Sequence, residues 1–210
     1  MPKTVLLYTD IKSPYAFVAK AAAWRLADDY DIELRWLPYT LDIPNYLGSV
    51  ADRNPHQWRR VRYSYMDARR FANRQGLVLR GPQKIFDTRL AHIAMLYADR
   101  AGALRPWLDL AFDLFWKREF DVEDPAAVIS VLKRAGIDAG GFAAWAASEG
   151  GAMHDRIRTE AEAAGVFGVP MFVIDGELFW GGDRIDMVRG RLDELGVPRR
   201  PPAAPAPRAA

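Results

Sequence analysis

The 210-residue chain contains no cysteine and only three histidines. The absence of cysteine excludes disulfide bonds, thiolate-bound zinc or iron–sulfur centres, and a cysteine nucleophile. His56, His92 and His154 lack the spacing of metal ligands, so no metal site is predicted. Each histidine is instead expected to lie on a helix surface or to be held by hydrogen bonds. The chain also lacks the glycine-rich nucleotide motifs and the common hydrolase motifs.

Charge of one sign and long apolar runs are also scarce. The 29 basic and 27 acidic side chains give a formal charge of +2, which does not indicate nucleic acid or a membrane surface as the main partner. The segment Trp58–Arg74 mixes arginines with aromatic residues and leaves contact with RNA as a minor alternative. No run approaches the ~20 apolar residues of a membrane span. The first apolar run reaches Asp10 too early for a signal peptide, so a cytoplasmic location is expected.

The first forty residues follow a β-α-β pattern. Residues Thr4–Thr9 form a short apolar run that is typical of a buried strand, and Ile32–Tyr39 alternates apolar and polar residues. Between them, Ser13 and Pro14 are a favoured helix start, because serine caps free amides and proline has no amide hydrogen to satisfy. The helix is predicted to continue to about Tyr30.

The middle of the chain has almost no strand signal, so residues 42–164 are predicted to form an all-helical insertion. Helices are expected at Trp58–Asn73, Thr88–Arg100, Leu104–Lys117, Pro125–Ala135, Ala139–Ser148 and Met153–Ala164. Strand character returns on both sides of the hairpin turn Asp175-Gly176, at Pro170–Ile174 and Glu177–Trp180. A last helix is predicted at about Arg184–Leu195, before a Pro/Ala/Arg-rich tail (197–210) that is expected to be disordered.

This order of elements favours an α/β protein with a thioredoxin-like fold. The β-α-β half lies in residues 1–41 and the β-β-α half in residues 165–196, and the helical insertion separates them. A helical crossover favours parallel pairing of the first two strands, and the hairpin adds antiparallel strands. The pattern alone leaves several other α/β folds open.

Two parts of the sequence carry a more specific resemblance. Residues 10–17 read DIKSPYAF, residues 165–173 read GVFGVPMFV, and residues 175–184 read DGELFWGGDR. Together they resemble the 2-hydroxychromene-2-carboxylate isomerases and the kappa-class glutathione transferases, relatives of the DsbA-type disulfide oxidoreductases. The resemblance covers most of the chain. It implies a bound glutathione, a homodimer, and a cis Val169–Pro170 peptide that faces the start of the first helix.

The resemblance assigns roles to residues at both ends. Disulfide oxidoreductases of this fold place a thiol at the N-terminus of the first helix, where the helix dipole favours a thiolate. Ser13 stands there in this sequence, which implies that it stabilises the thiolate of glutathione by a charge-assisted hydrogen bond. The alternative is a plain helix cap worth ~1 kcal/mol. Val169 and Pro170 are expected to bind the extended peptide, and Gly182 and Asp183 its γ-glutamyl end.

Other site residues are less closely specified. The family uses an asparagine and a cation from the start of the insertion, for which the candidates are Asn54 or its rival Asn45, and Arg60 or Arg62. A solvated helix face is the favoured explanation of these arginines. Lys12 and Tyr15 flank the Ser13-Pro14 pair and are candidates for contact with an anionic substrate.

The resemblance predicts a glutathione-dependent isomerase. In this reading a glutathione thiolate stabilised by Ser13 adds reversibly to a small, hydrophobic, unsaturated aromatic oxoacid. Two alternatives stay open. One is a kappa-like glutathione transferase, in which the adduct is the product, and the other is a redox-inactive binding module that holds a peptide strand beside Pro170. A dithiol oxidoreductase is excluded because the chain has no cysteine.

Overall fold

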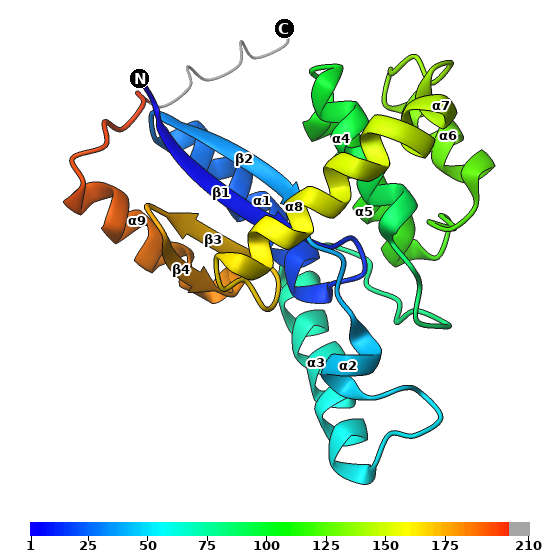
Figure 1. Ribbon diagram of the computed structural model, residues 1–210. Helices are drawn as coiled ribbons and strands as arrows, with labels where there is room; N and C mark the ends of the chain where they lie inside the picture. Colours follow the sequence, from blue (N-terminus) through cyan, green and yellow to red (C-terminus); the bar gives the residue numbers. More distant parts are fainter. Residues whose placement is uncertain (202–210) are drawn as a thin grey trace, which may run out of the picture.

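The computed structural model describes residues 1–201, apart from the side chains at positions 46 and 47, and contains a four-stranded sheet with helices on both sides (Figure 1). The strand order is β2-β1-β3-β4, with bounds at β1 Lys3–Thr9, β2 Ile32–Pro38, β3 Met171–Ile174 and β4 Glu177–Trp180. Strands β1 and β2 are parallel, whereas β3 pairs antiparallel with both β1 and β4. The two halves predicted from the ends of the chain therefore share one sheet.

Two helices from opposite ends of the chain cover one face of this sheet. Helix α1 (Pro14–Asp29) follows β1, and helix α9 (Ile185–Glu194) lies against it behind the strands in Figure 1. A short 3-10 turn, Gly182–Arg184, leads into α9 and packs against α1. A Cβ at Gly182 would lie 2.7 Å from the Cβ of Ala19, so glycine is needed for this close approach.

The helices between β2 and β3 extend in two directions. Helices α2 (Ile43–Leu47) and α3 (Pro55–Arg74) form an arm that projects below the sheet in Figure 1. The others gather beyond the edge of the sheet: α4 (Arg89–Arg100), α5 (Leu104–Lys117), α6 (Pro125–Arg134) and α7 (Phe142–Trp145). Helix α8 (Gly151–Ala163) then crosses in front of the strands and returns the chain to β3.

One hydrophobic core joins the sheet to these helices. The fully buried Phe17 of α1 stacks on Phe112 and Trp116 of α5, with 5.9 Å between ring centroids in each pair. Burial of each large aromatic side chain stabilises the fold by about 1.5–3 kcal/mol. The aromatic contact fixes α1, and with it the residues at the start of α1, relative to the helical segment.

Three details differ from the sequence predictions. Helix α2 was not expected; the Asp42 side chain caps it by accepting from the Asn45 amide at 3.3 Å. Helix α3 begins three residues earlier than expected, since Asn54 and Gln57 form a reciprocal capping box. The two helices predicted on either side of the Gly150-Gly151 pair form one continuous rod, in which a π-helical turn (Ala146–Gly150) joins α7 to α8.

The start of the predicted disordered tail is ordered, so that prediction began too early. The Asp31 amide donates to the Pro198 carbonyl at 2.8 Å, and the Arg200 amide donates to the Asp29 carbonyl at 2.8 Å. Arg199 forms an ion pair of 2.7 Å with Asp193. These contacts tie residues 198–200 to the end of α1, the start of β2 and the end of α9. Residues 202–210 of the predicted tail lie outside the described residues.

Within residues 1–201, no helix is both long and apolar enough to cross a membrane.

Candidate active site

A cavity of 690 Å³ opens at the N-terminal end of α1, where β1 ends. The turn from Lys12 to Tyr15 forms its floor, and the arm of α2 and α3 forms one wall. The loop at residues 81–86, the side chain of Arg118, residues 167–169 and Trp180 complete the lining. Segments from both halves of the chain therefore meet at the residue that begins the first helix.

Ser13 lies in this cavity with a relative exposure of 4%. Its Oγ caps α1 by accepting a hydrogen bond from the Ala16 amide at 3.2 Å. The only acceptor placed for its hydroxyl hydrogen among the described residues is the Val169 carbonyl, at 3.5 Å. This distance exceeds the ~2.5–3.0 Å of a normal O–H···O bond. The hydroxyl hydrogen is therefore only weakly engaged and is available to a ligand in the cavity.

The peptide between Val169 and Pro170 is cis, as the resemblance implied. Pro170 is buried behind Val169, and its carbonyl accepts a hydrogen bond from the Gly181 amide at 2.9 Å. The neighbouring Gly168 supports the indole of Trp180, because a Cβ at this position would lie 2.8 Å from the indole nitrogen. The expected juxtaposition of Ser13 with the residue before the cis proline is present.

Lys12 adds a cation to the floor of the cavity. Its ammonium group donates to the Phe86 carbonyl at 3.1 Å and lies 3.6 Å from Oδ2 of Asp10. Asp10 is fully buried and accepts from the amides of Lys12 and Leu41. Burial alone would raise the pKa of the Asp10 carboxyl, but His92, Lys12 and the Leu41 amide together hold it well below its usual range. Asp10 is therefore an anion beneath the site.

The lining of the cavity combines apolar surface with positive charge. Aromatic and aliphatic side chains contribute most of the surface: Leu41, Ile43, Trp58, Val61, Tyr65, Ile85, Phe86, Phe167 and Trp180. Six cationic side chains also line it, at Lys12, Arg53, Arg60, Arg69, Lys84 and Arg118. No carboxylate is among the described lining residues. This composition suits a ligand with an apolar body and negative charge.

Several of these cations are held by contacts around the mouth. Arg118 is the C-cap of α5 and has a positive φ of 63°, and its guanidinium donates to the Gly81 carbonyl at 2.6 and 2.8 Å. Arg53 stacks on Trp58, and Arg69 donates to the Leu79 carbonyl at 3.3 Å. The positive φ of a bulky residue costs ~1 kcal/mol or more, which the anchored guanidinium offsets.

The structure brings some of the predicted site residues together and leaves others apart. Lys12, Ser13, Tyr15, Arg60 and Val169 line the cavity. The remaining candidates do not: Pro170, Asn54, Asn45, Arg62, Gly182 and Asp183.

Local contacts account for the residues that lie apart. The Asn54 carboxamide accepts from the Gln57 amide at 2.9 Å, and the Asn45 carboxamide donates to Asp42 at 2.6 Å. Each asparagine side chain is therefore used within its own exposed helix start. Asp183 is exposed and pairs with Arg184 at 2.6 Å.

Tyr15 links the two helices that border the cavity. Its hydroxyl donates to Oδ2 of Asp67 on α3 at 3.1 Å. Burial and the neighbouring Asp67 raise the pKa of Tyr15 to about 12. Tyr15 therefore remains protonated at neutral pH and acts as a hydrogen-bond donor that holds α3 against α1.

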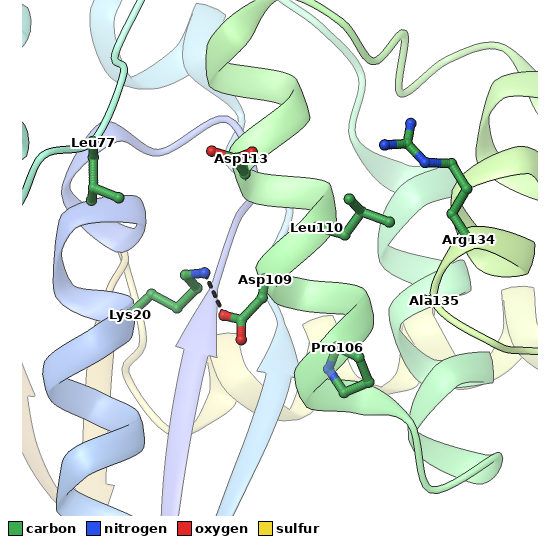
Figure 2. A pocket seen from close by; sticks show the side chains of 8 residues that line it. All are labelled: Lys20, Leu77, Pro106, Asp109, Leu110, Asp113, Arg134 and Ala135. Atoms are coloured by element: carbon green, nitrogen blue, oxygen red, sulfur yellow. Dashed lines mark hydrogen bonds and ion pairs between the residues drawn. The ribbon is translucent and has the colours of Figure 1, made fainter. Parts of the chain in front are cut away.

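A second hollow lies between α1 and α5 and is separate from this site. Figure 2 shows Lys20 of α1 paired with Asp109 of α5 across it, with Pro106 and Leu110 beside the pair. Half of its lining residues are charged, and both signs are present. It contains no residue of the Ser13 turn, so it carries no part of the candidate chemistry.

Sequence reasoning missed Asp10 and the aromatic and basic residues that close the cavity. Asp10 was part of the quoted DIKSPYAF segment, but its burial depends on contacts with residues far along the chain. Thr88 donates to Oδ1 of Asp10 at 2.8 Å, and the His92 ring lies 3.2 Å from the same oxygen. Both histidines buried here, His92 and His154, are held by hydrogen bonds, whereas His56 is exposed.

The fold and this site define a thioredoxin-like protein in which serine stands at the start of the first helix, opposite a cis proline. The sequence matches the DSBA-like thioredoxin domain family over residues 4–193, and the chain belongs to that family. The predicted thioredoxin-like fold is thereby confirmed.

Curated relatives share most of their length with this chain. It is 26% identical over 196 residues to a 2-hydroxychromene-2-carboxylate isomerase of Sphingobium xenophagum, which covers 91% of this chain and 99% of that protein. An isomerase of the same name from Pseudomonas putida is 26% identical over 194 residues and covers 90% and 93%. A solved structure of a 2-hydroxychromene-2-carboxylate isomerase superposes with a TM-score of 0.75 at 24% identity, covering 92% of this chain and 96% of that one.

Proposed function

We propose that the protein is a glutathione-dependent isomerase of an unsaturated aromatic oxoacid, similar to the 2-hydroxychromene-2-carboxylate isomerases. The observation that carries the proposal is the cavity at Ser13, which joins a weakly engaged hydroxyl to an apolar lining with six cations and no carboxylate. The curated relatives of this name support the reaction class.

The residues of the cavity floor fit the thiol end of glutathione. The Ser13 hydroxyl can donate to a thiolate, and charge-assisted bonds of this kind are stronger than neutral ones. The N-terminus of α1 adds the favourable end of the helix dipole, and Lys12 adds a positive charge beside it. The cis peptide at Val169 offers backbone groups beside Ser13 to an extended peptide.

When bound, glutathione supplies a nucleophilic thiol that is regenerated at the end of the cycle. Ser13 would hold that thiol ionised and oriented, because its hydroxyl hydrogen has no closer acceptor among the described residues than the Val169 carbonyl at 3.5 Å. Arg60, Arg69 and Arg118 lie around the same cavity, where they can bind a substrate carboxylate. The apolar walls exclude water from an aromatic ring.

The decisive experiment is calorimetric titration of the purified protein with reduced glutathione, with Ser13→Ala measured alongside. We expect saturable binding at a Kd of up to millimolar, and a thiolate ultraviolet band that is weaker in Ser13→Ala because the hydroxyl donor is lost. A matched control is Ser148→Ala, whose hydroxyl donates within an exposed helix to the Ala144 carbonyl. Absence of binding at ~10 mM glutathione would rule out the proposal.

Isomerisation is then tested with 2-hydroxychromene-2-carboxylate. An isomerase returns glutathione at each turnover, so its concentration stays constant while the substrate spectrum changes. Time-dependent consumption of glutathione would instead indicate a transferase. We expect Ser13→Ala to lower kcat by about 10²-fold, the loss typical for a hydrogen bond to a developing or full anion at a reacting centre.

A further inference from the structure

A chain of buried hydrogen bonds runs from the floor of the candidate site to the surface. Oδ1 of Asp10 lies 3.2 Å from Nε2 of His92, and Nδ1 of His92 lies 2.7 Å from the hydroxyl of Thr40. The same hydroxyl lies 2.9 Å from Nε2 of His154, whose Nδ1 lies 3.0 Å from Oδ1 of Asp155. Asp155 is exposed, and the four groups before it are buried.

The number of protons shared by these five hydrogen-bonded groups decides which atom donates in each contact. Four contacts link the five groups, whereas two neutral imidazoles and one hydroxyl carry only three protons. With three protons directed inward, Nε2 of His92 donates to Asp10, Nδ1 of His92 accepts from Thr40, and Nδ1 of His154 is unprotonated. A fourth proton enters at Nδ1 of His154, and the hydrogens of His154 Nε2 and of Thr40 each move one step inward, so that Nδ1 of His92 becomes protonated and donates to Thr40. His92 therefore has two states that differ by one proton and by the direction of its hydrogen bond with Thr40.

The fourth proton has consequences for Lys12. Asp10 is approached by the Lys12 ammonium group at Oδ2 and by the His92 imidazole at Oδ1. When His92 is neutral, Lys12 is the sole counter-charge that Asp10 has within salt-bridge distance among the described residues. When His92 is charged, it neutralises Asp10 from the side away from the cavity. The Lys12 ammonium then keeps its net charge for the cavity that it lines.

We propose that His92 is a positioning residue of the candidate site. It takes up one proton by way of Thr40 and His154, and the charge that it gains frees the Lys12 ammonium from Asp10 to attract an anion in the cavity. The inference rests on the proposed function only where it identifies that anion as a glutathione thiolate. The uptake of a proton by His92, here called the switch, does not need glutathione.

The charged groups around the two histidines favour a single extra proton. Asp10 and Lys12 face His92 from the end of β1, and Asp155 and Arg89 form an ion pair of 2.8 Å beside His154. The two imidazole rings stack with their centroids 6.1 Å apart, so a charge on one opposes a charge on the other. Burial lowers the pKa of His154, against the raising effect of Asp155. His92 lies 3.2 Å from the buried Asp10 carboxylate, and this geometry favours His92 as the place for a single positive charge.

The test uses nitrogen-15 NMR of the histidine rings in the free, full-length protein as pH is varied. Lys12→Met removes the competing cation from Asp10, so we expect the midpoint of His92 protonation to rise by about one pH unit, the size of a close charge–charge interaction at an effective dielectric constant of ~20. If His92 and Lys12 are not coupled through Asp10, no such shift is expected. An unchanged midpoint in Lys12→Met would overturn the proposal.

Two variants of Thr40 test whether protons reach His92 from solvent through Thr40 and His154. Thr40→Val keeps the shape but removes the hydroxyl, so protonated His92 loses the acceptor for its Nδ1 hydrogen and its midpoint falls. Thr40→Ser keeps the hydroxyl and should resemble the parent protein. Exchange of the His92 ring hydrogens with water should slow by about tenfold or more in Thr40→Val only. Equal exchange rates in the two variants would contradict the path through Thr40.

Glutathione binding gives a second readout that separates the two proposals. Ionisation of the bound thiol releases one proton, and His92 takes up another when the thiolate approaches Lys12. Calorimetry in buffers of different ionisation enthalpy, above the His92 midpoint, should therefore show well under one proton released by the parent protein. His92→Gln should release about one. If glutathione does not bind at all, the proposed function fails, and the histidine titration still decides on the switch.

Discussion

At the scale of single residues, Ser13 stands at the start of the first helix, where disulfide oxidoreductases of this fold carry a thiol. Its position at the start of α1 keeps the helix amides and dipole that favour a sulfur anion. Its hydroxyl cannot form a disulfide, so under the proposed function the sulfur is that of glutathione. The 3.5 Å separation from the Val169 carbonyl leaves room for that sulfur to accept the hydrogen bond.

Replacement of Ser13 by cysteine would restore a thiol in this environment. We expect the introduced thiol in Ser13→Cys to have a pKa of about 7 or lower, below the ordinary ~8.5, because of the helix N-terminus and Lys12. Ser148→Cys is the control, since Ser148 is exposed within a helical rod. The thiolate ultraviolet band measured against pH gives both values. An ordinary pKa in Ser13→Cys would show that the helix start does not stabilise a sulfur anion.

Asp10 makes stability depend on pH. Its pKa is lowered in the folded protein, so its ionised form stabilises the fold above the unfolded-state pKa of ~4, and this contribution is lost as pH falls from there toward the lower folded-state value. Asp10→Asn removes the buried anion and should cost about 3 kcal/mol at pH 7. Urea unfolding at pH 7 and at about pH 3 measures the difference between the two proteins, which should shrink at the lower pH. A difference that does not depend on pH would contradict the assigned ionisation.

At the scale of secondary-structure elements, the π-helical turn between α7 and α8 shows the limit of local sequence signals. Two helices were predicted, one on each side of the Gly150-Gly151 pair, and glycine is a weak helix former. In the structure the ring of Trp145 lies over Gly150, where a Cβ would be 2.5 Å from ring carbons. Trp145 also packs on Tyr97 and Arg100 of α4. The glycine is therefore required by packing between helices, which local propensity does not report.

This packing gives a prediction for two glycines in helices. Gly150→Ala should destabilise the protein by about 1–3 kcal/mol, because the added methyl group collides with the buried Trp145 ring. Gly190→Ala is the matched control in α9, where nothing lies within 4 Å of the added Cβ, and it should stabilise by about 0.5–1 kcal/mol. Thermal unfolding of both variants gives the comparison. Equal effects at the two positions would contradict the close packing.

Elements with strong local signals were predicted well. Leu104–Lys117 and Glu177–Trp180 have the expected bounds, and Asp124 caps α6 by accepting from the Ala126 amide at 3.0 Å. The hairpin turn Asp175-Gly176 has the two positive φ values that its residues favour, 51° and 84°. Helix caps and tight turns depend on neighbouring residues, so the sequence specifies them directly.

Parts of the candidate site depend instead on contacts between distant segments. Motifs at the two ends of the chain located Ser13 and the cis proline. The series of hydrogen bonds described above joins Asp10 to His154, which are 144 positions apart in the sequence. It passes through His92 and Thr40, whose local sequence shows no unusual pattern. Only the packing of α4 and α8 against the strands brings these side chains together.

At the scale of the whole molecule, the small net charge gives no indication of the positive charge that gathers at the site. A formal charge of +2 is nearly neutral for 210 residues, yet six cations and no carboxylate line the described part of the cavity. Acidic residues instead pair with surface cations on the outer helices, as Glu160 does with Arg156 and Glu162 with Arg158. A positive cavity with apolar walls focuses the field and attracts anions from solution.

The positive potential in the cavity predicts that anion binding weakens as salt is added. Variants of two arginines can separate the effect of the cavity from the effect of net charge. Arg69 lines the cavity, so Arg69→Gln should weaken glutathione binding by about threefold to tenfold at low ionic strength and reduce its dependence on salt. Arg156→Gln on α8 removes the same charge from an exposed surface ion pair and should leave the affinity nearly unchanged. Calorimetric titrations at about 20 mM and 500 mM salt measure both effects, since the Debye length falls from about 20 Å to about 4 Å over this range. If the two variants lose affinity equally, the attraction comes from net charge alone, and the cavity arginines have no particular part in binding the anion.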